Sequence, residues 1–355
     1  QRPVRAALGL MDAYGIARAL VMSPPRAPGV KGNQEYPDFA PAIAPHGERF
    51  SFMAGGGSLN PILHGVANDL SIDAGVRADF ARAAREAVKA GAAGYGEMGT
   101  LHLSLSSSHG YTYAPADHPL LLYLADIAAG LDVPIDLHMD AVAAQGPLPK
   151  QLAANPKNPM SLPATLPGLE KLLAHNPKAK IVWAHGGTDH VGDFTPAAIG
   201  ALMDRHANLY MSLKVTGGQA NTFNKLLAGN GVDSAWLDLL RRHSDRFVIG
   251  SDSFFADPTN MEASPIGEFS MTVERRLQAT RQFLSLLPPD LARKIGHQNA
   301  VSLYRLPPLP PPDAASQPAV AAPAAQGLCK DGNLDHCKTM CQRGVQRACA
   351  QLKRQ

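Results

Sequence analysis

Cysteine is absent from the first 328 residues, and all four cysteines of this 355-residue chain lie in its last 27 positions. The body of the protein therefore folds without disulfides, while the tail can carry its own. No stretch approaches 18 uninterrupted apolar residues, which excludes a membrane span. Charged residues make up only 18% and hydrophobic residues 45%, a balance that excludes intrinsic disorder. These absences predict a soluble globular protein with a large core.

Net charge is also missing from the body. The whole chain carries +3, but residues 328–355 hold six Lys/Arg and two Asp/Glu, a net charge of +4. Asp313 is the single charged residue of the segment before that tail. Residues 1–306 are therefore neutral overall, which gives no reason to expect a nucleic-acid partner.

Short apolar stretches that end in polar or glycine residues alternate with stretches in which Ala and Leu recur at helical spacing. This alternation predicts a parallel sheet with right-handed crossovers, as an open sheet or a closed barrel. The expected strands are residues 19–23, 50–54, 92–98, 134–139, 180–185, 209–215 and 246–252. The expected helices include residues 77–90, 119–130, 167–176, 196–206, 234–243 and 273–287.

The glycine pattern does not favour an open nucleotide-binding sheet. Gly55, Gly56 and Gly57 follow a strand but lead into Ser58-Leu59-Asn60-Pro61, which we interpret as a loop. The length fits one (β/α)₈ TIM barrel with an appendage, and seven strands are one short of that barrel. We therefore expect an α/β TIM barrel over residues 1–306 with its first strand missing.

The composition changes after the barrel. Residues 307–327 are rich in Pro and Ala and open with PPLPPP, so they are predicted to form a semi-rigid extended linker. Residues 328–355 then form a separate cysteine-rich tail.

Potential metal ligands stand at the ends of four predicted strands: Glu97, His138, His185 and Asp252. Functional residues of a parallel barrel project from the C-terminal ends of its strands. Carboxylates and imidazoles bind divalent ions such as zinc. Taken singly, each residue has an ordinary alternative as a hydrogen-bonded histidine or a helix N-cap. Together, at equivalent depths, they predict one metal site.

Two further residues are candidates for substrate binding. Lys214 ends another strand, where its cation could hold a substrate carboxylate or a developing oxyanion, although a lysine lying along the rim is an equal alternative. His102 lies in the loop after the Glu97 strand, either as a substrate contact or as an ordinary loop histidine.

The segments AGYGEMG, VPIDLHMDA, KIVWAHGG, RFVIGSDSFF and HQNAVSLYRL occur in a characteristic order. In this the chain resembles the amidohydrolase-related metal-dependent hydrolases, TIM barrels of the amidohydrolase superfamily, over about residues 5–306. The resemblance implies that His138 and His185 are metal ligands. It also implies that Asp252 binds metal and accepts a proton from the nucleophilic water, and that Glu97 is a bridging or metal-binding group. The implied cofactor is a divalent metal, with zinc favoured.

One departure from the family is large, because the chain contains no His-x-His anywhere. The family places that motif at the end of its first strand. We expect the native gene product to encode an upstream strand ending in His-x-His, and residues 1–355 alone to bind metal poorly.

The resemblance implies a metal-dependent hydrolase that cleaves an amide, ester or lactone in a small-molecule substrate. A non-oxidative decarboxylase of the same superfamily is the alternative. Such an enzyme should hold substrate carboxylates with an arginine, and no strand end here presents one. A third interpretation is a non-catalytic barrel whose tail serves protein interaction.

The tail repeats a C-x₇-C pattern with glycine at the same internal position. It resembles Sel1-like cysteine-rich helical repeats, which implies bonds between Cys329 and Cys337 and between Cys341 and Cys349. A four-cysteine zinc site fits the spacing poorly, and a Cys337–Cys341 bond is geometrically harder. Disulfides imply a periplasmic or secreted protein. The basic face of the tail is either solvated, which we favour, or a contact for a protein partner.

Overall fold

The computed structural model describes residues 2–29, 35–105, 110–153, 155–216, 222–254 and 267–308, with side chains from residue 273 onward in the last range. The predicted linker beyond residue 308 and the cysteine tail lie outside the described residues. In the part of the chain described, no helix is both long enough and apolar enough to cross a membrane.

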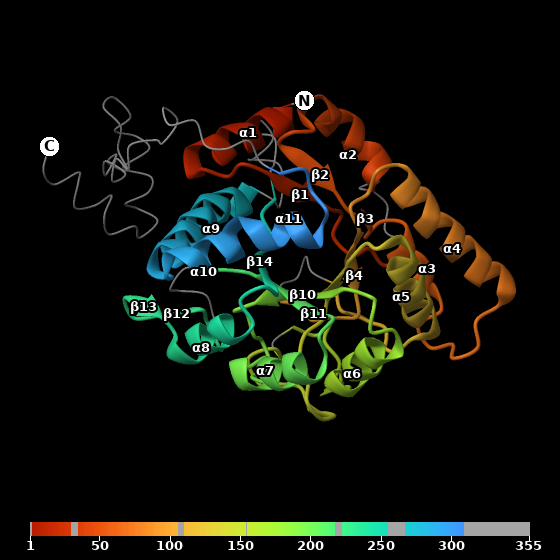
Figure 1. Cartoon of the computed structure of the whole chain (residues 1–355). Helices are drawn as coiled ribbons and strands as arrows, with labels where there is room; N and C mark the ends of the chain where they lie inside the picture. The colour runs from red at the N-terminus through yellow and green to blue at the C-terminus, as the bar shows by residue number, and fades with distance from the viewer. Residues whose placement is uncertain are drawn as a thin grey trace, which may run out of the picture. The chain divides into compact units, whose positions relative to one another are not determined.

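Parallel strands occupy the centre of the molecule (Figure 1). Six of them form one sheet in the order β14-β11-β10-β7-β4-β3, and β1 pairs with β2 in a second sheet. Only Met53 separates β2 from β3, so the two sheets share one chain segment. The strands are β1 (Ala19–Val21), β2 (Phe50–Phe52), β3 (Ala54–Gly55), β4 (Tyr95–Gly99), β7 (Ile135–His138), β10 (Ile181–Gly186), β11 (Leu209–Leu213) and β14 (Phe247–Ile249).

Helices surround these strands (Figure 1). They are α1 (Arg2–Tyr14), α2 (Tyr36–Ile43), α3 (Leu59–Gly65), α4 (Ala74–Lys89), α5 (Pro119–Leu131), α6 (Leu166–His175), α7 (Pro196–Arg205), α8 (Ser234–Arg242), α9 (Gly267–Leu286), α10 (Pro289–Arg293) and α11 (Asn299–Leu303). A 3₁₀ turn (Ala44–His46) and a π turn (Lys294–Gln298) connect them, and short antiparallel pairs form from β5 (Leu101–His102) and β6 (Thr112–Tyr113), β8 (Gly146–Pro147) and β9 (Ser161–Leu162), and β12 (Leu227–Ala228) and β13 (Gly231–Val232).

The sequence explains where several helices begin. Asp73 caps α4 by accepting a hydrogen bond from the Gly75 N–H, and Asp233 caps α8 by accepting from the Ala235 and Trp236 N–H groups. Proline stands in the first turn of α5, α6 and α7, where its missing N–H costs nothing. The helices then bury one face, as α4 does with the fully buried Phe80, a side chain whose burial stabilises by roughly 1.5–3 kcal/mol.

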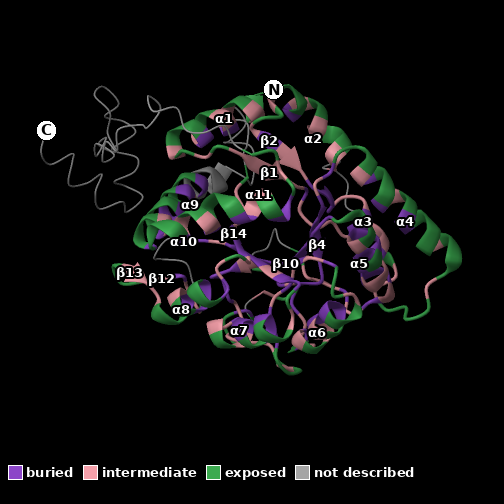
Figure 2. Ribbon diagram, viewed as in Figure 1, coloured by how far each residue is buried: buried purple, intermediate pink, exposed green. Residues whose placement is uncertain are grey.

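Alternate strand residues face two different cores, as the two-residue period of a strand requires. Ile181 and Trp183 of β10 belong to the main core beneath the helices, whereas Val182 joins a second cluster with Met53 and Val248. Leu303 and Tyr304 at the end of α11 complete that second cluster. Buried residues follow the strands and the strand-facing sides of the helices (Figure 2). The sheet therefore separates the second cluster from the main core.

The α/β class and the parallel sheet are confirmed, and each of the seven predicted strands overlaps an observed one. Closure of the barrel is not observed. Within the described residues β14 pairs only with β11 and β1 only with β2, and no described strand lies before β1 or bridges the two.

The prediction of a loop after Gly57 is wrong, since α3 begins at Leu59. Pro61 falls in the first turn of that helix, where proline is tolerated. Gly56 must be glycine, because a Cβ there would lie 2.1 Å from the Ser23 carbonyl oxygen. The glycine-rich segment is therefore a tight turn from β3 into α3.

Candidate metal centre

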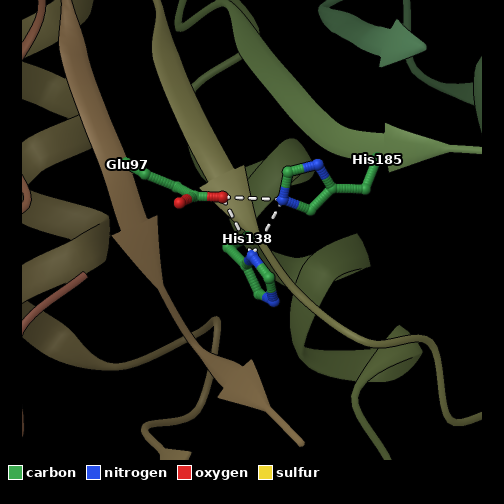
Figure 3. A group of neighbouring side chains, drawn as sticks. All are labelled: Glu97, His138 and His185. Atoms are coloured by element: carbon green, nitrogen blue, oxygen red, sulfur yellow. Dashed lines mark hydrogen bonds and ion pairs between the residues drawn. The ribbon is translucent and has the colours of Figure 1, made fainter. Parts of the chain in front are cut away.

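Glu97, His138 and His185 point toward one another from β4, β7 and β10 (Figure 3). Glu97 Oε1 lies 2.9 Å from His138 Nδ1 and 2.8 Å from His185 Nε2. The two histidine nitrogens are 3.0 Å apart. Parallel neighbouring strands bring their C-terminal ends to one edge, and the register sets Gly99 of β4 opposite His138. The sheet thus assembles the three donors directly.

Backbone geometry adds to the case that this is a functional site. His185 adopts a left-handed conformation with φ of 70°, and Asp252 does so with φ of 46°. Such conformations are uncommon for residues other than glycine, although His and Asp adopt them more often than most, and they tend to occur at functional sites. Thr188 holds the turn at His185, because its N–H and its hydroxyl both donate to the His185 carbonyl at 3.0 and 2.7 Å.

The electrostatics of the group follow from burial and mutual contact. Burial opposes ionisation of Glu97, but His138 and His185 hold the pKa of its carboxyl well below the ordinary value. Burial favours the neutral form of His138, yet the Glu97 carboxylate raises the pKa of that imidazole. Burial and then the Lys214 ammonium lower the pKa of His185. Glu97 is therefore a carboxylate and His185 a neutral imidazole, the forms that ligate metals.

These residues fit a divalent ion. Their three donor atoms all lie within 4.8 Å of one another. The observed spacings of 2.8 to 3.0 Å are close to the roughly 3.3 Å between ligands in a tetrahedral zinc site. Two imidazole nitrogens that face each other and a carboxylate would all be satisfied by one cation. The donor set of two nitrogens and one oxygen suits zinc and other first-row divalent metals.

Asp252 belongs to a second group of side chains. It follows β14, and Lys214 Nζ donates to its Oδ2 at 2.5 Å. Arg276 Nη1 of α9 lies 3.8 Å from the same oxygen and donates to the Asp252 and Ser251 carbonyls. Burial opposes ionisation, but the Lys214 ammonium lowers the pKa of the Asp252 carboxyl. Asp252 is therefore an ionised carboxylate held by two cations, next to the three clustered donors but outside their group.

His102 lies against the same centre. Its ring centroid is 4.7 Å from that of His138, and its Nδ1 is 2.9 Å from the Gly110 carbonyl oxygen. Lys214, by contrast, is occupied with Asp252. Both residues that we predicted to bind substrate thus adjoin the predicted ligands.

The structure adds Arg276 and Asp136, which the sequence did not reveal. Arg276 reaches the site from α9. The sequence signal that could have revealed it is its helical spacing from Val273, Leu277 and Thr280, which are buried on the same face of α9. Asp136 shares the inward face of β7 with His138, and burial and then Glu97 raise the pKa of its carboxyl well above the ordinary value. Asp189 fixes the loop after β10 by accepting from the Val191, Gly192 and Phe194 N–H groups.

A family model described as Amidohydrolase matches residues 64–306. The chain belongs to this amidohydrolase family. The matched range includes all four predicted metal-site residues of this amidohydrolase, Glu97, His138, His185 and Asp252.

No curated protein matches this amidohydrolase. Among solved structures it is similar to an uncharacterized TIM-barrel protein from Bordetella bronchiseptica, with 16% identity, 84% of this chain and 82% of that chain covered, and a TM-score of 0.49. It is also similar to a 2,6-dihydroxybenzoate decarboxylase from Rhizobium, with 15% identity, 84% of this chain and 87% of that chain covered, and a TM-score of 0.48. A third similar structure is a dihydroxybenzoic acid decarboxylase from Polaromonas, solved with bound manganese and 2-nitroresorcinol. The identity is 16%, 84% of this chain and 85% of that chain are covered, and the TM-score is 0.49.

Proposed function

We propose that this amidohydrolase is a metal-dependent hydrolase that cleaves an amide, ester or lactone in a small-molecule substrate. The observation that carries the proposal is the pairing of a three-donor metal centre with a separate ionised carboxylate, Asp252, beside it. Hydrolysis needs both an activated water and an acceptor for its proton. The centre offers a place for each.

The chain's own residues divide the work. Glu97, His138 and His185 would hold the ion, which we propose to be zinc. A divalent ion at such a site lowers the pKa of a water ligand toward about 7 and polarises the substrate oxygen. Asp252 would accept the proton of the attacking water at Oδ1 or Oδ2. Lys214 and Arg276 keep that carboxylate oriented and ionised until it does so. His102, whose ring lies tilted against that of His138, would border the space where substrate lies.

Elemental analysis and a substrate screen test this function together. The sequence predicts poor metal binding without a His-x-His, but Glu97, His138 and His185 already form a donor group in this chain. The purified chain should therefore contain a divalent metal. A panel of esters, lactones and amides should include a substrate whose product gains oxygen from water labelled with a heavy oxygen isotope. Removal of metal with a chelator should abolish turnover, and zinc should restore it. A chain that binds no divalent metal would favour the non-catalytic interpretation.

A non-oxidative decarboxylase is the second candidate, and one observation favours it. None of the described strand ends presents an arginine, but α9 supplies Arg276 to the same place. A cation there could hold a substrate carboxylate if it exchanged Asp252 for substrate. Adding aromatic carboxylates to the panel separates the two reactions, because release of carbon dioxide without oxygen incorporation identifies decarboxylation.

For the tail we propose two local disulfides and an oxidising location such as the bacterial periplasm. The duplicated C-x₇-C pattern supports this. Peptide mapping without reductant should link Cys329 to Cys337 and Cys341 to Cys349. Four free thiols in protein produced in the periplasm would contradict the proposal.

A further inference from the structure

The strand that carries Glu97 loses its neighbour halfway along. β3 pairs with β4 through Ala54 opposite Tyr95 and Gly55 opposite Gly96, and the chain then turns away into α3. The Glu97 N–H donates to the carbonyl of Ser23, just beyond β1, at 3.1 Å, which leaves the Glu97 carbonyl and the Gly99 N–H to be paired. Buried peptide groups must find hydrogen-bond partners or destabilise the fold. These two groups therefore need a partner that is not a strand.

Asn60, in the first turn of α3, is that partner. Its side chain is fully buried. Asn60 Nδ2 donates to the Glu97 carbonyl oxygen at 2.6 Å, and Asn60 Oδ1 accepts from the Gly99 N–H at 3.0 Å. A residue of a neighbouring parallel strand would likewise donate to one carbonyl and accept from the N–H two residues later. The Asn60 carboxamide thus continues the ladder one step beyond β3.

The same residues of β4 are held on their other side by the strand that carries His138. Gly99 is in register with His138, and the Thr100 N–H donates to the His138 carbonyl at 2.9 Å. One helical turn after Asn60, His64 Nε2 lies 3.0 Å from the Gly99 carbonyl oxygen. Side chains four residues apart share a helix face, so α3 holds the end of β4 at three backbone atoms.

We propose that Asn60 is a positioning residue for the metal ligand Glu97. The proposal rests on the metal site given under the proposed function. Asn60 does not touch the ion. It fixes the two peptide groups on either side of Met98, and so sets where the Glu97 carboxylate stands relative to His138 and His185. A ligand held to within a fraction of an ångström binds an ion more tightly than one that must be ordered on binding.

Only a side chain with one donor and one acceptor in this arrangement can do this. Asn60→Asp keeps the acceptor for Gly99 but loses the donor to Glu97, and Asn60→Leu loses both. The aspartate also brings a negative charge toward the centre, which by itself would tighten cation binding. Weaker metal binding in Asn60→Asp therefore reports a displaced Glu97 and not a change in local charge.

Asn299 provides a matched control. It is also a buried helical asparagine that fastens a strand, because its Nδ2 donates to the Ser244 and Phe247 carbonyls at 2.9 and 2.7 Å. Those carbonyls lie at the start of β14, at the opposite end from Asp252. Asn299→Leu thus removes a comparable pair of buried hydrogen bonds without reaching the metal centre.

The experiment measures zinc dissociation constants by competition with a chromophoric chelator, and the visible absorption spectrum of the cobalt-loaded protein. Asn60→Asp and Asn60→Leu should weaken zinc binding about 10-fold and alter the cobalt spectrum. Asn299→Leu should stay within about twofold of the parent chain with an unchanged spectrum, even though its Tm also falls.

The outcomes separate the two proposals. If the parent chain binds no zinc, the metal site itself is wrong and Asn60 has nothing to position. If the parent chain binds zinc and the Asn60 variants bind it equally well, or no worse than Asn299→Leu, only the positioning role is overturned. Asn60→Asp keeps one of the two hydrogen bonds, so it serves as the measurement if Asn60→Leu does not fold.

Discussion

Two sides of the strand-end face satisfy their polar groups in different ways. On β4, β7 and β10, Glu97 and two histidines share three short contacts in which one carboxylate oxygen meets two imidazole nitrogens. On the other side, Asp252 after β14 is paired with two cations of the protein itself, Lys214 after β11 and Arg276 of α9. The first side, the donor cluster, has ligand atoms in excess over cations. The second, the ion-paired cluster, already supplies cations to its carboxylate, so we propose ion binding for the first and proton transfer for the second.

The strongest test of this division removes ligands from the donor cluster. His138→Ala and His185→Ala should each lose stoichiometric metal and lower kcat/KM at least about a thousandfold, about 4 kcal/mol of transition-state stabilisation. The measurements are elemental analysis and steady-state kinetics, with circular dichroism to show that the fold persists. His175→Ala, on α6 beside Asp126, is the control that should keep both metal and activity. Stoichiometric metal in both ligand variants would refute the assignment.

The ion-paired cluster should respond differently. Asp252→Asn keeps the size of the side chain but removes the proton acceptor, so kcat should fall about 100- to 1000-fold. Metal affinity should fall much less than in the histidine variants, because Asp252 stands outside the donor cluster. Asp238→Asn, at an exposed site on α8, controls for a lost carboxylate. A loss of metal equal to that of His185→Ala would show that Asp252 is a ligand, as the family resemblance implies.

Lys214→Met tests whether Lys214 keeps Asp252 ionised in the ion-paired cluster. Although burial opposes ionisation of Asp252, the Lys214 ammonium keeps the pKa of its carboxyl below the ordinary value. Without that cation the pKa rises, so protonated Asp252 persists to higher pH. The acidic limb of the kcat profile should therefore move to higher pH, with activity near neutrality reduced about tenfold or less. An acidic limb that stays where it is would show that Lys214 does not set the ionisation of Asp252.

The donor cluster could be predicted from the sequence because two local signals coincide there: an apolar strand and a metal-ligating side chain at its end. Apolar strands that end in Glu97, His138 and His185 must place those side chains at one edge if the sheet is parallel, and the structure does bring them together. Arg276 and Asn60 were missed because they reach the site from helices. The rotation and depth at which a helix packs depend on tertiary contacts that no local pattern specifies. The sequence predicts a barrel, but pairing between distant strands has no local signal, and no pairing that closes the barrel is observed among the described strands.

The smallest expected effect concerns His118 at the start of α5. His118 caps this helix, with Nδ1 accepting from the Leu120 N–H at 3.2 Å and Nε2 lying 3.0 Å from the Val66 carbonyl oxygen at the end of α3. Burial lowers the pKa of His118 in the folded protein. As the pH falls, His118 of the unfolded chain therefore takes up a proton near pH 6.5, while His118 of the folded protein is still neutral. The contribution of His118 to stability is therefore complete above about pH 6.5 and declines as the pH falls toward the lowered pKa.

His118→Asn keeps a capping oxygen but cannot titrate. Its unfolding free energy should therefore lie about 1 kcal/mol below that of the parent chain at pH 7.5, and the difference between the two proteins should narrow at pH 5. Denaturant unfolding at the two pH values measures this. Parallel losses of stability in the two proteins would show that another group makes the fold acid-sensitive.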